Sequence, residues 1–208
     1  MESATDNSVY TWENNSIYYI TNGIWSPLKR VDDGWGFWDG VRSANLFLEN
    51  FDPKVLERFQ YNEDYDEMID KASKFSLEVR FLRAFYLFEL AKRYGDIPLI
   101  TRTYTQEEIN SVRKTSFADV IDFIAKECTE ITREGGLPED GVRGETGRVT
   151  KGAALALKSR ALLYAASDLH NPAHDLTKWE AAAKAAYEVI KMNKYQLPNV
   201  STDPLYSD

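Results

Sequence analysis

Several residue types with distinctive chemistry are scarce in this chain of 208 residues, and each shortage excludes a class of structure or function. The one cysteine cannot form a disulfide bond within the chain. Acidic residues outnumber basic ones, and the formal charge is −8 at pH 7. Because nucleic-acid phosphates bind basic surfaces, we expect no nucleic-acid partner.

Long apolar runs are absent as well. No stretch approaches the roughly 20 consecutive apolar residues that span a bilayer, so we expect no transmembrane helix. The residues that follow Met1 are polar, with neither a cationic region nor an apolar core. They do not have the pattern of a secretory signal peptide.

The cysteine, Cys128, lies in a helical pattern of apolar residues that includes Ile121, Ile124 and Ile131. Such a position is typical of a small buried hydrophobic side chain. We therefore expect Cys128 to be part of a core and not a catalytic nucleophile.

Two patterns suggest metal sites but lack essential residues. An EF-hand loop starting at Asn62 needs glycine at its sixth position and glutamate at its twelfth, where this chain has Glu67 and a serine. The acidic run at residues 62–67 is better explained as the solvated start of a helix.

His170 and His174 are four residues apart, but Pro172 between them opposes a helix and no third ligand follows. We expect solvated histidines in a surface loop and no bound metal.

No motif for covalent chemistry is evident. The glycines between positions 135 and 147 lack the spacing of a phosphate-binding loop, and no strand precedes them. Asp32 and Asp33 form a carboxylate pair, as glycoside hydrolysis requires, but the side chains of adjacent residues usually diverge. We expect no enzymatic activity, no catalytic residue and no cofactor.

The clearest element present is an amphipathic helix within residues 76–100. Its apolar residues, three phenylalanines among them, recur at helical spacing and form one wide stripe. Ser76 is expected to cap its start, Gly95 to close its end and Pro98 to prevent its continuation. Because the phenylalanines need partners, this helix must pack against others.

Four further helices are expected. One begins near Phe37 and ends before Pro53. Patterns of the capping-box type at Ser116 and Thr177 open two more. Thr150 caps an alanine-rich helix, whose small side chains let a neighbouring backbone approach closely. The predicted fold class is all-α, with antiparallel helix pairs joined by long irregular loops.

Three stretches of the chain carry distinctive motifs: SANLFLENF at positions 43–51, EVRFLRAFYLFELAKRYGDIPLI at 78–100 and GRVTKGAALALKSRALLYAAS at 147–167. Together they resemble the SusD/RagB family, the nutrient-binding outer-membrane lipoproteins of Bacteroidetes-type bacteria. The resemblance runs in the family's order and covers about residues 34–197.

The resemblance implies properties that the spacing of the helices does not show. It implies a tetratricopeptide-like fold, although no repeat of about 34 residues is legible here. It also implies capture of oligosaccharides or polysaccharides, or of peptides in some relatives, at the cell surface. The resemblance further implies that the captured nutrient passes to a TonB-dependent transporter of the SusC type. Family members are held at the outer membrane by a lipidated cysteine that follows a signal peptide, and this sequence contains neither.

Aromatic residues near the start of the chain suggest where a sugar binds, because four of the five tryptophans lie within the first 38 residues. Sugar rings pack on aromatic side chains, and their hydroxyls need amides and charged groups nearby. Trp35 and Trp38 are expected to cover the adjacent helix instead. Ligand residues vary within the family, so the candidates come from local chemistry alone: Trp25, Tyr19, Asn22, Arg30, Asp32 and Asp33.

The chain is expected to have three parts. Residues 1–34 form an aromatic-rich loop segment packed on the helical domain of residues 35–197, and residues 198–208 form a tail. Because family members are longer, the tail is expected to be a truncation point, with an apolar face exposed where a second half packs. The alternative function is a helical-repeat interaction module that binds a peptide or protein partner.

Overall fold

A computed structural model describes most of the chain: residues 3, 5–11, 15–26, 28, 32, 34–140 and 147–196. The chain divides into two compact units, Met1–Trp35 and Gly36–Asp208. The first contains the short helix α1 (Ile17–Thr21). Packing of residues 1–34 on a helical domain of residues 35–197 stays a prediction, and the predicted tail of residues 198–208 lies outside the described residues.

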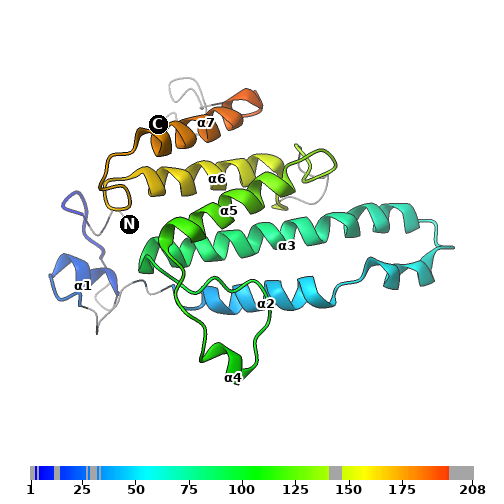
Figure 1. Cartoon of the computed structure of the whole chain (residues 1–208), viewed down its shortest axis with the longest axis horizontal. Helices are drawn as coiled ribbons and strands as arrows, with labels where there is room; N and C mark the ends of the chain where they lie inside the picture. The colour runs from blue at the N-terminus through cyan, green and yellow to red at the C-terminus, as the bar shows by residue number, and fades with distance from the viewer. Residues whose placement is uncertain are drawn as a thin grey trace. The chain divides into compact units, whose positions relative to one another are not determined.

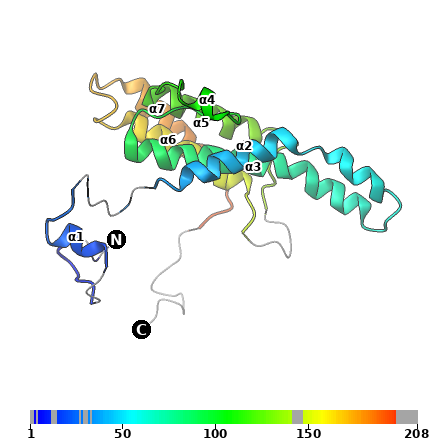
Figure 2. The ribbon, with the colours of Figure 1, turned by 90° about the horizontal axis from the view of Figure 1, so that it is seen from below.

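The second unit is a stack of helices in which each long helix packs on the next (Figure 1). Seen from below, α2 and α3 run side by side, with η2 in the turn that joins them (Figure 2). The part of the chain that the structure describes contains no β-sheet, which confirms the all-α prediction. The elements of the second unit are α2 (Phe37–Asn50), the 3-10 helix η2 (Pro53–Phe59), α3 (Tyr65–Tyr94), α4 (Gln106–Ile109), α5 (Phe117–Ile131), α6 (Lys151–Ala166) and α7 (Leu176–Lys191).

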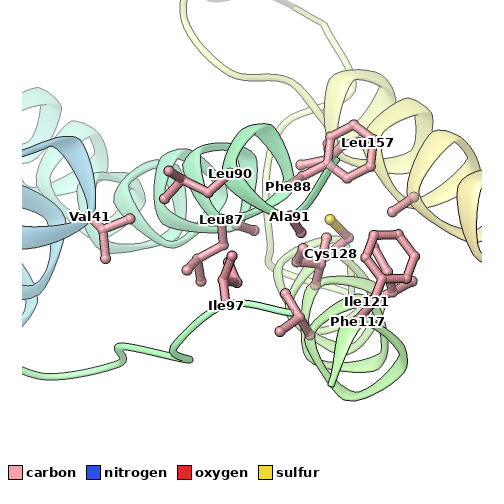
Figure 3. Packing of buried hydrophobic residues seen from close by; sticks show 14 of the residues in the cluster. Val41, Leu87, Phe88, Leu90, Ala91, Ile97, Phe117, Ile121, Cys128 and Leu157 are labelled. Atoms are coloured by element: carbon pink, nitrogen blue, oxygen red, sulfur yellow. The ribbon is translucent and has the colours of Figure 1, made fainter. Parts of the chain in front are cut away.

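The core lies where α3, α5 and α6 meet (Figure 3). Leu87 and Phe88 of α3 and Ile121 of α5 are fully buried there. Cys128 is buried among them, as predicted. Burial and the neighbouring Glu127 charge raise the pKa of its thiol to about 12, so the nucleophilic thiolate is suppressed.

Helix α3 is longer than predicted. It begins at Tyr65, and Ser76 lies in its interior without capping it. The prediction failed because no glycine or proline interrupts the chain between Tyr65 and Ser76, so a favourable cap residue simply continues the helix. The acidic run before it is a helix start, with Asp66 and Glu67 in the first turn, as expected. At the other end, Gly95 closes the helix with φ of 68°.

Cap residues were predicted for α5, α6 and α7. Two of these predictions are confirmed and the third is wrong. The hydroxyls of Ser116 and Thr150 accept backbone N–H groups at the starts of α5 and α6. Thr177, by contrast, does not open α7. Asp175 is the cap, and its carboxylate accepts the N–H of Thr177 at 2.9 Å. A charged acceptor two residues upstream satisfies the free N–H groups, so the helix starts earlier.

The loop between α6 and α7 corrects the prediction of two solvated histidines. The side chain of His174 is 73% exposed. The ring of His170, however, stacks on Phe117 at the start of α5, with the ring centroids 3.5 Å apart. The Lys178 ammonium also donates to the His170 carbonyl oxygen at 3.1 Å. His170 therefore links the α6–α7 loop to α5.

Candidate ligand-binding site

The aromatic candidates lie on one turn that follows α1. The N–H of Asn22 donates to the carbonyl oxygen of Tyr18 at 2.9 Å and ends the helix. Gly23 then takes a φ of 66°, which glycine adopts at little cost. The chain turns back, so that the Trp25 N–H donates to the carbonyl oxygen of Tyr19 at 2.8 Å. This hydrogen bond places Tyr19 and Trp25 next to each other across the turn.

The side chains of this turn are accessible to a ligand. Trp25 is 64% exposed and Tyr19 is 36% exposed. Ile24 lies between them in sequence and is also exposed. A tryptophan face in water, beside a tyrosine and the exposed Asn22 amide, provides the apolar and polar groups that a sugar ring needs.

The structure brings together three of the six predicted site residues, namely Tyr19, Asn22 and Trp25. Asp32 is exposed, whereas Arg30 and Asp33 lie outside the described residues. Any direct contact with a ligand stays a prediction for all six. Exposed Ile24 and Leu28 also belong to this region, and they were missed because an isolated aliphatic residue carries no binding signal in a sequence.

A second notable group of side chains is a buried polar network in the helical unit. The Arg83 guanidinium donates to Asn45 Oδ1 and to Glu127 Oε2, each at 3.0 Å. Arg80 forms a two-point ion pair with the same Glu127 carboxylate, at 3.0 and 2.7 Å. Because Asn45, Arg83 and Glu127 are all buried, this network joins α2, α3 and α5 inside the protein.

The electrostatics of Glu127 follow from these contacts. Burial alone raises the pKa of a carboxyl group. Hydrogen bonds and positive charge from Arg80 and Arg83 outweigh burial, and they hold the pKa of Glu127 below its ordinary value. Glu127 is therefore ionised at neutral pH and neutralises one of the two guanidinium charges. The network has a structural role, because both carboxylate oxygens of Glu127 already accept hydrogen bonds from Arg80 and Arg83.

The three sequence motifs behind the resemblance meet through this network and one further pair. Asn45 comes from the first motif and Arg83 from the second. Glu78 of the second motif forms a two-point ion pair with Arg148 of the third, at 3.0 and 2.6 Å. The charged residues of these motifs thus hold the helices together. Glu127 was not among the predicted residues, although a charged residue within an apolar stripe indicates a buried partner.

Within the described residues, no three metal-ligating side chains gather as a metal site requires. None of the described helices combines the length and apolar character needed to cross a bilayer.

The fold and these polar pairs define a class of protein: a tetratricopeptide-like stack of antiparallel helices (Figure 1). The family described as SusD-like, starch-binding and associating with the outer membrane, matches residues 3–163. The chain belongs to this SusD-like family, as its sequence motifs predicted. A comparison with curated proteins found no match.

Solved structures support this assignment. A SusD-like protein from Bacteroides fragilis is 32% identical, with a TM-score of 0.62 over 82% of this chain and 29% of its own. A SusD-like carbohydrate-binding protein from the same species is 26% identical, with a TM-score of 0.65 over 94% of this chain and 34% of its own. A laminarin-binding SusD-like protein is 26% identical, with a TM-score of 0.61 over 84% and 33%. The chain thus spans about a third of the length of these relatives.

Proposed function

We propose that this chain binds oligosaccharide or polysaccharide at a bacterial outer membrane without altering it. The observation that carries the proposal is the exposed turn of Tyr19, Asn22 and Trp25 in a member of the SusD-like family. An exposed tryptophan offers the face of its ring to a ligand, and the apolar C–H face of a sugar is a suitable partner for it. The polar neighbours fit the sugar hydroxyls.

Starch and laminarin are the first ligands to test. The family description names starch, and one similar structure is of a laminarin-binding protein. We propose that this chain takes a glucan of this kind, with Trp25 stacked on one ring and Arg30, Asp32 and Asp33 among the groups that contact its hydroxyls. Binding leaves the glycosidic bonds intact, because the role is capture and not cleavage.

The experiment is calorimetric titration with a panel of starch-derived and laminarin-derived oligosaccharides, comparing the native chain with Trp25→Ala. We expect W25A to weaken binding about ten-fold, which corresponds to about 1.4 kcal/mol. Tyr61→Ala is the matched control, because Tyr61 is an aromatic residue 92% exposed in the other unit. Y61A should bind as the native chain does.

Delivery of the glycan to a TonB-dependent transporter of the SusC type is the further step that we propose. The support is family membership, since the family is described as associating with the outer membrane. Co-purification with a transporter barrel encoded beside this chain supports delivery. A chain that retains a peptide or protein but gives no heat with any glycan contradicts the glycan proposal and favours the interaction-module alternative.

A further inference from the structure

Asn22 and Gly23 form an asparagine–glycine pair at the turn that follows α1, where both residues are exposed. No other asparagine of the chain is followed by glycine. The backbone nitrogen after an asparagine lies within reach of the side-chain amide carbon, so that a reaction between them is intramolecular. Glycine allows the closest approach, because it has no Cβ atom and adopts a wide range of backbone angles. The sequence therefore favours this reaction at Asn22 over every other asparagine.

The reaction forms a cyclic imide with loss of ammonia. The Gly23 nitrogen gives up its proton to base and bonds to Cγ of Asn22. The bond between Cγ and the side-chain nitrogen breaks, and ammonia leaves with the proton. Water then opens the imide at either of its carbonyl carbons, which gives aspartate or isoaspartate. Water and base are the only reagents, and no atom is oxidised or reduced.

The closed turn slows this reaction. The Gly23 N–H donates to the carbonyl oxygen of Ile20 at 3.0 Å, so the nitrogen that must attack is engaged. Asn22 has a ψ of 4°, which directs the Gly23 nitrogen away from the Asn22 side chain. The protection is limited, however, because α1 has 5 residues and so short a helix is marginal by itself. Each local opening of α1 frees the Gly23 nitrogen.

The isoaspartate product changes the geometry of the turn. In isoaspartate the main chain runs through the former side chain, and this adds a main-chain atom between Tyr19 and Trp25. The hydrogen bond that closes the turn, from the Trp25 N–H to the Tyr19 carbonyl oxygen at 2.8 Å, depends on the native spacing. Both products also replace a neutral amide by a carboxylate. Modification at Asn22 therefore alters the shape and the charge of the turn.

We propose that Asn22–Gly23 is a site of spontaneous deamidation, and that formation of isoaspartate there opens the aromatic turn as the protein ages. The modification depends on the backbone, on base and on water, and it requires no glycan. Only its effect on glycan affinity rests on the proposed function: loss of the closed turn should weaken binding.

Asn110 provides a matched control within the same chain. It is exposed and it ends the short helix α4, as Asn22 ends α1. The Ser111 N–H donates to the carbonyl oxygen of Glu108 at 3.0 Å, the same pattern as at Gly23. The ψ of Asn110 is −19°, close to that of Asn22. The main difference between the two sites is the side chain of the residue that follows asparagine.

The first test is incubation of the native chain at neutral and at mildly alkaline pH, followed by peptide mass spectrometry. We expect Asn22 to convert about ten-fold faster than Asn110, because glycine lowers the barrier to attack. Both rates should rise with pH, since the attacking nitrogen must lose its proton. Asn22→Gln should stop conversion at this position, because its longer side chain closes the ring much less readily. Equal rates at Asn22 and Asn110, or a rate at Asn22 that does not rise with pH, overturn the proposal.

The second test measures hydrogen exchange at the Trp25 N–H. In the isoaspartate fraction this group should exchange about ten-fold faster than in fresh protein, because it has lost its acceptor on Tyr19. Asn22→Asp adds the charge without lengthening the main chain, so its Trp25 N–H should exchange as in fresh protein. Unchanged exchange in the isoaspartate fraction contradicts the proposal. Titration of fresh protein with oligosaccharides decides the glycan proposal separately, so the two proposals fail by different measurements.

Discussion

Glu127 shows how a single residue fixes the packing of this fold. Its carboxylate joins Arg80 and Arg83 of α3 to α5, and its side chain is only 11% exposed. The Arg83 side chain is equally buried, and its Nε has no hydrogen-bond partner among the described residues. A buried cation of this kind depends on its remaining partners, because charge without compensation is unfavourable in a protein interior.

Replacement of Glu127 by alanine should therefore destabilise the protein strongly. Two guanidinium groups then lose their carboxylate, and we expect the free energy of unfolding to fall by about 3–5 kcal/mol. Chemical denaturation at neutral pH measures the loss. Glu130→Ala is the control on the same helix, since its partner Arg133 is 64% exposed, and it should change stability by less than about 1 kcal/mol. Equal effects of the two substitutions contradict the role assigned to Glu127.

His170 gives the protein a pH dependence of known sign. Burial and the nearby Lys178 charge lower the pKa of His170, and Asp96 only partly opposes them. The unfolded chain therefore takes up the proton more readily than the folded chain. The stability associated with His170 is complete above the unfolded pKa, and it is lost as the pH falls through the lower folded pKa.

Unfolding followed between pH 7 and pH 5 tests this assignment. We expect the melting temperature to decrease toward pH 5 in the native protein and to decrease less in His170→Phe, which keeps a ring against Phe117. His174→Asn is the control, because His174 is exposed and asparagine tolerates its positive φ. A native slope that H174N removes and H170F retains shows that the assignment is wrong.

Residue-level prediction succeeded where the signal was local. Gly95 and Thr150 act at helix ends, where backbone geometry and free N–H groups favour these residue types whatever surrounds them. Ser76 and Thr177 carried the same signal and failed, because neighbouring residues continued or started the helix. Glu127 required knowledge of which helices pack together, which local spacing does not contain.

At the scale of elements, the connector between α3 and α5 is held by side chains of two helices. Asn45 donates to the carbonyl oxygens of Ile100 and Arg102, at 3.2 and 3.1 Å. Arg83 donates to the Thr101 carbonyl oxygen between them, at 3.0 Å. Three consecutive carbonyls are thus satisfied by buried donors. These hydrogen bonds fix residues 100–102, which form no helix or strand. The polar composition of residues 101–115 did not predict that this part of the connector is fixed.

The contact between α2 and α3 depends on a glycine. A Cβ atom added at Gly40 would lie 2.6 Å from the Tyr86 ring. Helix propensity alone predicts that Gly40→Ala stabilises α2 by up to about 1 kcal/mol. We expect the opposite result, a loss of about 1–3 kcal/mol from overpacking. Thermal unfolding measures it, with Gly36→Ala as control because nothing lies within 4 Å of that position. A stabilised G40A would show that the two helices separate easily.

The candidate binding element was only partly predictable. Trp25 and Tyr19 were selected for their chemistry, and the turn at Gly23 that brings them together follows from the φ that this glycine adopts. The same reasoning could not place Asp32 relative to Trp25. Positions in a loop depend on contacts with distant segments, which carry no periodic pattern.

At the scale of the whole molecule, the helical class and the family were predictable because three long motifs agree in order. The family match over residues 3–163 and the similar solved structures confirm both. The polar pairs explain why the motifs occur together, since Asn45, Glu78, Arg83 and Arg148 connect them physically. Ligand identity was not predictable, because sugar recognition rests on a few side chains of variable loops.

The central claim is the proposal that the exposed aromatic turn after α1 captures a glucan. Titration of one starch- or laminarin-derived oligosaccharide into the native chain and into W25A, side by side in a calorimeter, tests it most directly. The account predicts saturable heat with the native chain and about ten-fold weaker binding with W25A. Equal affinities for the two proteins would contradict it.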